Sequence, residues 1–150
     1  MPVAVPVTTA AAAPVADRAE RAIVRQLNRE RHRFGLRALR LTRSLNRAAT
    51  SHSRLILRTN QLTHDGTNGT PFAARIKRSV HFGLVGETLA WMPRGSGTGA
   101  RTVVALWMRS PAHRATLLDP RYRRIGVGRL RGAMGSVGGV AVTADFGTLR

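Results

Sequence analysis

The sequence contains no cysteine, so disulfides, thiolate metal sites and thiol nucleophiles are excluded. Aromatic side chains are also few, with four Phe, two Trp and one Tyr, which leaves little flat surface for stacking nucleic-acid bases. No apolar run approaches the roughly 18 residues that a membrane-spanning helix needs. We therefore expect no transmembrane segment, and nucleic acid is a disfavoured partner.

Carboxylates are scarce as well. Seven Asp and Glu residues stand against 25 basic residues, which gives a formal net charge of +18 at pH 7. The basic residues are arginines apart from Lys77, and they are spread along the chain, which is typical of a solvated surface rather than a dedicated nucleic-acid site. Such a surface attracts anionic partners through a Coulomb interaction that salt weakens.

The length of 150 residues is that of about one domain. Residues 1–16 carry no charged side chain and show neither helical nor strand periodicity, so we interpret them as a disordered lead-in or a signal-peptide remnant. They lack the positive first region of a secretory signal, although small residues precede Asp17 as they do at a cleavage site. Residues 17–150 are predicted to form the folded domain.

Two helices are predicted in the first half of the domain. Asp17, followed three residues later by Glu20, has the form of a capping box and predicts a helix start. Thr42 is predicted to cap a second helix, which ends before a loop over 62–69. His52 lies on the apolar stripe of this second helix, where a hydrogen-bonded core histidine is more common than a ligand.

The segment 103–108 leaves almost no polar face, so it predicts a core helix that is covered on more than one side. Ser110 and Pro111 then form a helix stop and restart, since Ser is a favoured N-cap and Pro is tolerated at the first helical position. His113 falls in the first turn of the new helix. There the positive end of the helix dipole disfavours imidazolium, which predicts a neutral His113 with a lone pair for a proton or a metal.

Three extended segments are predicted around these helices: 81–91, 123–130 and 137–147, the last two joined by a turn near 132–135. Glu87 is the only carboxylate among apolar neighbours in the first of them. It therefore needs a cationic, hydrogen-bonding or metal partner, or its pKa rises. Helices followed by strands predict an α+β domain with helices packed on an antiparallel sheet.

Spacing alone does not group the chemically active residues. No local motif such as HExxH, a phosphate-binding glycine loop or GxSxG links His64, Glu87 and His113. By this criterion alone, three unrelated residues are the favoured interpretation and a shared site is the alternative.

Five sequence blocks occur in one order: LNRERHRFGLRALRL, LTHDGTNGTPFAARI, VGETLAW, WMRSPAHRATLLDPRYRRIGVG and VTADFG. Together they resemble the bacterial branch of the CAP superfamily, the SCP-like extracellular domains related to cysteine-rich secretory proteins, antigen 5 and plant pathogenesis-related proteins. The resemblance implies an α-β-α sandwich, with helices on both faces of a small, mainly antiparallel sheet. It also implies a central cleft that two histidines and two glutamates line in many members.

The resemblance assigns His64, Glu87 and His113 to this cleft. Ser110 stands where animal and fungal relatives have the fourth member, a glutamate, and is a cleft neighbour. The implied site is suited to a divalent metal such as zinc on His64, His113 and Glu87, and the alternative is a hydrogen-bonded cluster that holds loops together. Asp145 is expected to be structural, receiving backbone N–H groups or an arginine.

The function that the resemblance favours is a secreted or envelope-associated binding or interaction module. Its cleft would accept an apolar or anionic envelope ligand, either a lipid or a cell-wall polymer. The alternative is a metal-assisted hydrolase, peptidase-like or esterase-like, in which His64 and His113 hold the ion and Glu87 is the candidate catalytic base.

Overall fold

The computed structural model describes residues 15–78, 81 and 83–148. The lead-in predicted over 1–16 lies outside the described residues except for its last two positions. The elements, in chain order, are α1 Arg18–Arg33, β1 Arg40–Leu41, α2 Arg43–Thr59, a 3-10 turn Thr67–Gly69, α3 Phe72–Lys77, β2 Val85–Pro93, α4 Ala100–Arg109, α5 Pro111–Leu117, β3 Tyr122–Met134 and β4 Val137–Thr148.

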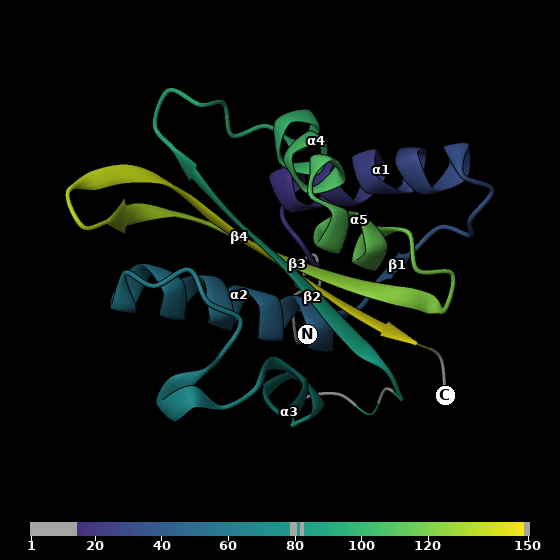
Figure 1. Ribbon diagram of the computed structural model, residues 1–150, viewed down its shortest axis with the longest axis horizontal. Coiled ribbons are helices and arrows are strands. Elements are labelled where there is room, and N and C mark those ends of the chain that lie inside the picture. The colour runs from purple at the N-terminus through teal and green to yellow at the C-terminus, as the bar shows by residue number, and fades with distance from the viewer. Residues whose placement is uncertain (1–14, 79–80, 82, 149–150) are drawn as a thin grey trace, which may run out of the picture.

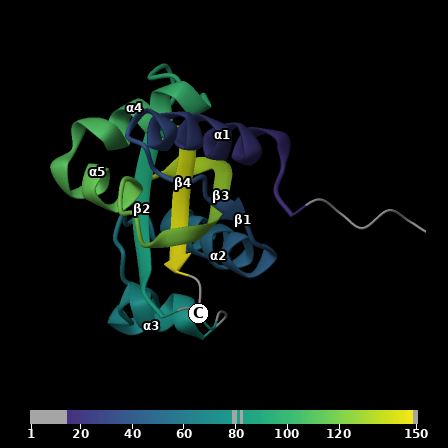
Figure 2. The same cartoon turned by 90° about the vertical axis from the view of Figure 1, so that its right-hand side faces the viewer.

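The strands form one sheet in the order β1-β3-β4-β2, in which β1 runs parallel to β3 and the other pairs are antiparallel. Helices α1, α4 and α5 cover one face of this sheet, and α2 and α3 lie against the other (Figures 1 and 2). The predicted α-β-α sandwich is confirmed. Among the described residues, no helix combines the length and apolar character that crossing a bilayer requires.

Both predicted helix starts in the first half are confirmed. The Glu20 backbone N–H donates to Asp17 Oδ1 at 2.8 Å, and the Asp17 N–H donates to Glu20 Oε2 at 2.9 Å, which completes a capping box. The Leu45 N–H donates to Thr42 Oγ1 at 3.4 Å and caps α2. Each pair satisfies backbone donors that have no partner within the helix.

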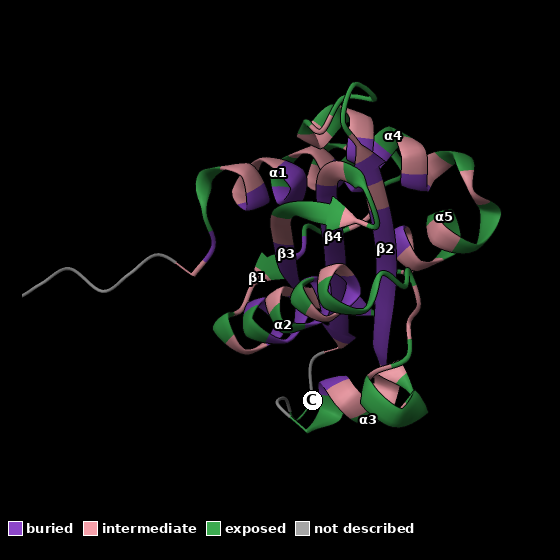
Figure 3. Cartoon of the chain, turned by 90° about the vertical axis from the view of Figure 1, so that its left-hand side faces the viewer, coloured by how far each residue is buried: buried purple, intermediate pink, exposed green. Residues whose placement is uncertain are grey.

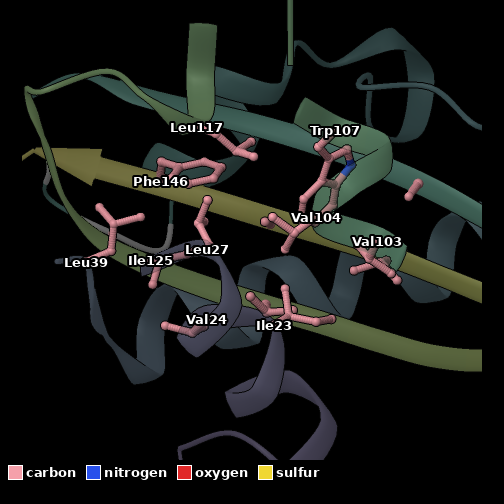
Figure 4. Close-up of a cluster of buried hydrophobic side chains, with 14 of the residues drawn as sticks. Ile23, Val24, Leu27, Leu39, Val103, Val104, Trp107, Leu117, Ile125 and Phe146 are labelled. Atoms are coloured by element: carbon pink, nitrogen blue, oxygen red, sulfur yellow. The ribbon is translucent and has the colours of Figure 1, made fainter. Parts of the chain in front are cut away.

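The main apolar core fills the space between the sheet and α1, α4 and α5. Figure 4 shows side chains from these helices meeting Ile125 and Phe146 of the sheet. Trp107 at its centre is fully buried, and its indole N–H donates to the Leu89 carbonyl at 2.9 Å. The prediction that α4 is covered on more than one side is confirmed, because the helix packs against α1, α5 and β2 and leaves one solvent face, which carries Arg101 and Arg109 (Figure 3).

On the opposite face, two glycines let α2 lie directly on β3. A Cβ at Gly126 would lie 2.0 Å from the Leu45 carbonyl carbon, and one at Gly128 would lie 2.3 Å from the Thr50 nitrogen. No side chain fits in either place, since backbone atoms of the helix occupy it. The Ile-Gly-Val-Gly sequence of β3 is therefore required for this close approach, which brings the buried side of α2 within reach of polar groups on the sheet.

Two structural features were absent from the predictions. One is β1, whose two residues pair only with Arg124 and Ile125 of β3. Beyond them, Asn46 Oδ1 accepts the Val127 N–H at 3.0 Å and Glu20 Oε1 accepts the Arg129 N–H at 3.2 Å, so side chains satisfy the strand edge. The other is the length of β3, which reaches Met134, so the turn lies at 135–136 rather than near 132–135.

Arg31 is buried, unlike the arginines on the outer face of α1. Its guanidinium donates to three carbonyl oxygens in and after α5: Leu117 at 2.7 Å, Asp119 at 3.1 Å and Tyr122 at 3.3 Å. Its Nε donates to the Arg37 carbonyl at 3.0 Å. Burial lowers the pKa of Arg31 from its ordinary value. This side chain ties α1 to the end of α5 and the start of β3.

Candidate functional site

Glu87 is the third residue of β2, the strand at one edge of the sheet. Its side chain is fully buried and faces the α2 and α3 side, because Val85, two residues earlier on the same strand face, packs against Leu45 and Ile76. Asp145 of β4 is its partner across the antiparallel ladder and is also fully buried. Two carboxyl groups therefore sit side by side in the interior.

Two side chains from outside the sheet engage Glu87. His64 Nδ1, in the loop after α2, lies 2.9 Å from Glu87 Oε1. Arg75, from α3, forms an ion pair with Glu87 Oε2, and its Nη1 lies 3.9 Å from Asp145 Oδ2. The prediction that Glu87 needs a partner is confirmed, since both of its oxygens are occupied. An arginine does lie near Asp145, as expected, but the 3.9 Å separation is an ion pair without a hydrogen bond.

His52 supports this cluster from α2. Its Nε2 lies 2.7 Å from the Thr63 carbonyl oxygen and 3.9 Å from Glu87 Oε1. Since a carbonyl only accepts, Nε2 carries the proton, and the interpretation of His52 as a hydrogen-bonded core residue is confirmed. Burial lowers the pKa of His52 and outweighs the opposing charge of Glu87, which keeps the ring neutral.

The two buried carboxyl groups differ in charge. Burial raises the pKa of Asp145 well above its ordinary value, and the neighbouring charge of Glu87 raises it further. Burial acts in the same direction on Glu87, but the hydrogen bond from His64 and the charge of Arg75 outweigh it, so the pKa of Glu87 lies below its ordinary value. Asp145 therefore holds a proton more tightly than Glu87 does, and Glu87, opposite Arg75, is the first of the pair to take the negative charge.

His113 and Ser110 belong to α5, on the other side of the edge strand. His113 lies in the first turn, as predicted, and is half-buried. Burial lowers its pKa, and the charge of His64 lowers it further. The direction agrees with the predicted neutral ring, although the causes are burial and His64 rather than the helix end. Ser110 occupies the predicted N-cap position, but its side chain makes no capping hydrogen bond.

The arrangement does not fit a divalent metal. Within the part of the chain that the structure describes, no group of three or more His, Asp or Glu side chains is placed to hold an ion. A cation on Glu87 would compete with Arg75 for Oε2 and with His64 for Oε1. An ion on His64, Glu87 and His113 stays a prediction, and the Arg75 ion pair opposes it.

The sandwich fold, with a buried His/Glu cluster at its edge strand, defines the class of protein. Residues 24–146 match the CAP family, described as the cysteine-rich secretory protein family, and the chain belongs to this family. Over 122 residues it is 31% identical to uncharacterized protein YkwD of Bacillus subtilis (strain 168), a match that covers 81% of this chain and 46% of YkwD.

Two solved structures share the fold. An extracellular protein containing an SCP domain from Bacillus anthracis str. Ames has a TM-score of 0.72 at 24% identity, covering 87% of this chain and 40% of that one. An outer surface protein from Borrelia burgdorferi has a TM-score of 0.71 at 22% identity, covering 87% and 92%. The chain thus spans less than half the length of YkwD and of the Bacillus anthracis protein.

Proposed function

We propose that this CAP domain acts outside the cell or in the cell envelope as a non-catalytic module that binds anionic envelope ligands. The location is supported by relatives of the same fold that are extracellular or outer surface proteins. The ligand class is supported by the net charge of +18. A strongly positive domain is attracted to phosphate-bearing lipids and polymers, and salt weakens that attraction.

The state of Glu87 carries the non-catalytic part of the proposal. A general base needs a free oxygen and a pKa near the working pH, whereas both Glu87 oxygens are engaged and its pKa is lowered. Its contacts instead hold the segment that contains His64. Arg75 also donates to the His64 carbonyl at 3.5 Å, and His52 binds the adjacent Thr63 carbonyl. The cluster thus anchors the loop that follows α2.

The second candidate is a metal-assisted hydrolase that uses His64, His113 and Glu87. It is favoured by the direct contact of His64 with Glu87 and by the effect of the charge of His64 on His113. It requires the Arg75 ion pair to open so that Glu87 can activate a metal-bound water. The two candidates therefore differ in what Glu87→Gln does to turnover.

The experiment measures adsorption and turnover with the same preparation. We expect the protein to adsorb to vesicles containing phosphatidylglycerol, or to a poly(glycerol phosphate) polymer, and not to pure phosphatidylcholine vesicles, with adsorption falling as salt rises. Ester and peptide substrates with added zinc should give equal background rates for wild type and Glu87→Gln. Failure to bind either anionic probe at low salt, or zinc-dependent turnover that Glu87→Gln abolishes, contradicts the proposal.

A further inference from the structure

A cavity of about 300 Å³ opens beside the anchored loop, between α2, the residues that follow it and α3. Four arginines and no carboxylate line it: Arg54, Arg58, Arg75 and Arg78. A larger cavity of about 720 Å³ adjoins it and shares Arg58 and Leu55 in its lining. The two cavities share five lining residues, the arginines gather in the smaller one, the basic end, and one carboxylate, Asp65, lines the larger one.

The charges at the basic end are not balanced by the protein. Arg75 is paired with Glu87, so its charge is neutralised. Arg54, Arg58 and Arg78 are exposed, and among residues 15–78, 81 and 83–148 none of the three makes a side-chain hydrogen bond or ion pair. Three like charges around one small cavity repel each other, and an anion placed among them removes that repulsion.

The shape and the remaining lining indicate what kind of anion fits. Guanidinium groups donate in a planar fork that matches phosphate oxygens. Ser51 and Thr67 add hydroxyl groups to the arginine cavity. The larger cavity is lined by Leu55 and by Leu62, a half-exposed apolar side chain. A phosphate at the basic end can therefore carry a small carbon chain. The chain would lie beside Leu55, and its hydroxyl groups would pair with Ser51 and Thr67.

We propose that the cavity lined by Arg54, Arg58 and Arg78 binds a phosphate ester of a small polyol such as glycerol. This chemistry occurs in the headgroup of an anionic phospholipid and in a phosphodiester-linked envelope polymer. The inference rests on the proposed function and gives it a location. That location lies between α2, the loop that follows it and α3, and neither His64 nor His113 lines it.

The cluster of Glu87, His64 and His52 determines the shape of this cavity. The loop that forms one wall is held by His64 on Glu87 and by His52 on the Thr63 carbonyl. His52 itself lies in the wall of both cavities. A disturbance at Glu87 is therefore transmitted to the cavity without any direct contact between Glu87 and the phosphate.

The test titrates glycerol 3-phosphate into the full chain and follows binding by NMR chemical shifts or calorimetry at low salt. The pocket variant combines Arg54→Gln, Arg58→Gln and Arg78→Gln. A matched control removes the same charge from the opposite side of the sheet, at three exposed positions on and after α1: Arg18→Gln, Arg25→Gln and Arg37→Gln. All six positions are exposed, so both proteins should fold, which thermal melts verify.

We expect the pocket variant to bind glycerol 3-phosphate about tenfold or more weakly, and the control to stay within about twofold of wild type. Arg58→Gln alone should give an intermediate loss, since Arg58 lines both cavities. Equal losses in the two triple variants would show general electrostatic attraction and overturn the inference. So would a duplex oligonucleotide that competes for the same cavity more strongly than glycerol 3-phosphate does.

Two further binding experiments distinguish a lipid headgroup from a phosphodiester polymer as the source of the phosphate. Adsorption to phosphatidylglycerol vesicles that glycerol 3-phosphate displaces identifies a lipid headgroup. Binding of poly(glycerol phosphate) without vesicle adsorption identifies a phosphodiester polymer. If wild type and both variants adsorb equally to an anionic probe, the cavity is rejected while the proposed function stands. If wild type binds no anionic probe, both are rejected.

Discussion

The two faces of the sheet are built in opposite ways. Against α1, α4 and α5, the sheet presents apolar side chains such as Val127, Val142 and Phe146, and these form the main core. Against α2 and α3, it presents Gly126 and Gly128 together with buried polar groups. Alternation along each strand separates the two sets, since successive side chains point to opposite faces.

The two faces of the sheet therefore have different roles in this domain. The apolar face is stabilised by burial and loses stability when side-chain volume is removed, so it fixes the sheet. The other face contains Glu87, Asp145, His52 and Ser53, which depend on hydrogen bonds and charge pairing. These groups hold a loop and the wall of a cavity, so changes there should alter binding and pH response more than the fold.

The apolar face should give the largest loss of stability. Trp107→Ala removes the central buried side chain and also leaves the Leu89 carbonyl without its indole donor. We expect the free energy of unfolding to fall by about 3 to 5 kcal/mol in urea titrations. Leu106→Ala on the same helix is the control, because that side chain is only half-buried. Similar losses for the two variants would contradict the assignment of Trp107 to the core.

The close contact between α2 and β3 should be the next most sensitive. Gly126→Ala places a methyl group 2.0 Å from the Leu45 carbonyl carbon, so the helix has to move away from the strand. We expect a loss of about 1 to 3 kcal/mol or more, measured by chemical unfolding. Gly99→Ala serves for comparison, since no atom lies within 4 Å of its added Cβ and its φ is negative. An unaffected Gly126→Ala protein would remove the case for direct backbone packing.

The polar face should make stability depend on pH. Burial lowers the pKa of His52 in the folded protein, whereas the unfolded chain takes up a proton near the usual histidine value of about 6.5. Stability present at neutral pH is therefore lost as pH falls below that value, by at most about 1.4 kcal/mol per pH unit for one proton. The lowered pKa of His113 acts in the same direction.

Urea titrations between about pH 7 and pH 5 measure this dependence. His52→Gln should flatten it, and His32→Gln, at an exposed position, should not. The raised pKa of Asp145 works in the opposite sense, because its stabilising neutral form is lost as pH rises. Asp145 is present in wild type and in both variants, so the difference between the wild-type and His52→Gln profiles gives the contribution of His52 alone. Parallel profiles for the two variants would mean that His52 is not the responsive group.

Zinc should have the smallest effect. Because Arg75 and His64 already occupy Glu87, we expect stoichiometric zinc to leave the melting temperature of wild type unchanged. Arg75→Met would release one Glu87 oxygen and should increase any response to zinc. A zinc-dependent rise in the melting temperature of wild type that His64→Ala or His113→Ala removes would contradict this expectation and support the predicted metal site.

Much of the fold could be predicted from local signals. The Asp17 and Glu20 capping box, the Thr42 cap and the position of His113 depend on residues a few positions apart, and the structure has all three. The two-residue β1 gives no periodic signal and exists only through its pairing with β3. The extent of β3 was also missed, because glycines near the hairpin indicate a turn even where they remain in the ladder.

The site was predictable only in part. The resemblance placed His64 beside Glu87, and the contact between them is present. Arg75 could not be selected, because it is one of many arginines and its role depends on how α3 is oriented over the sheet. The available signal was Glu87 itself, an isolated carboxylate that requires a cation. Arg31 gave no such signal, since its partners are backbone carbonyls far along the chain.

The most direct test is a double-mutant cycle between Arg75 and Glu87, with Arg75→Met, Glu87→Gln and the double variant compared by urea unfolding. If Glu87 is an anchor held by Arg75, each single change leaves a buried group without its partner, and the double variant should lose less than the sum of the two. We predict a coupling free energy of about 1 to 3 kcal/mol. Additive losses would show that the two residues act independently and would contradict the structural role assigned to Glu87.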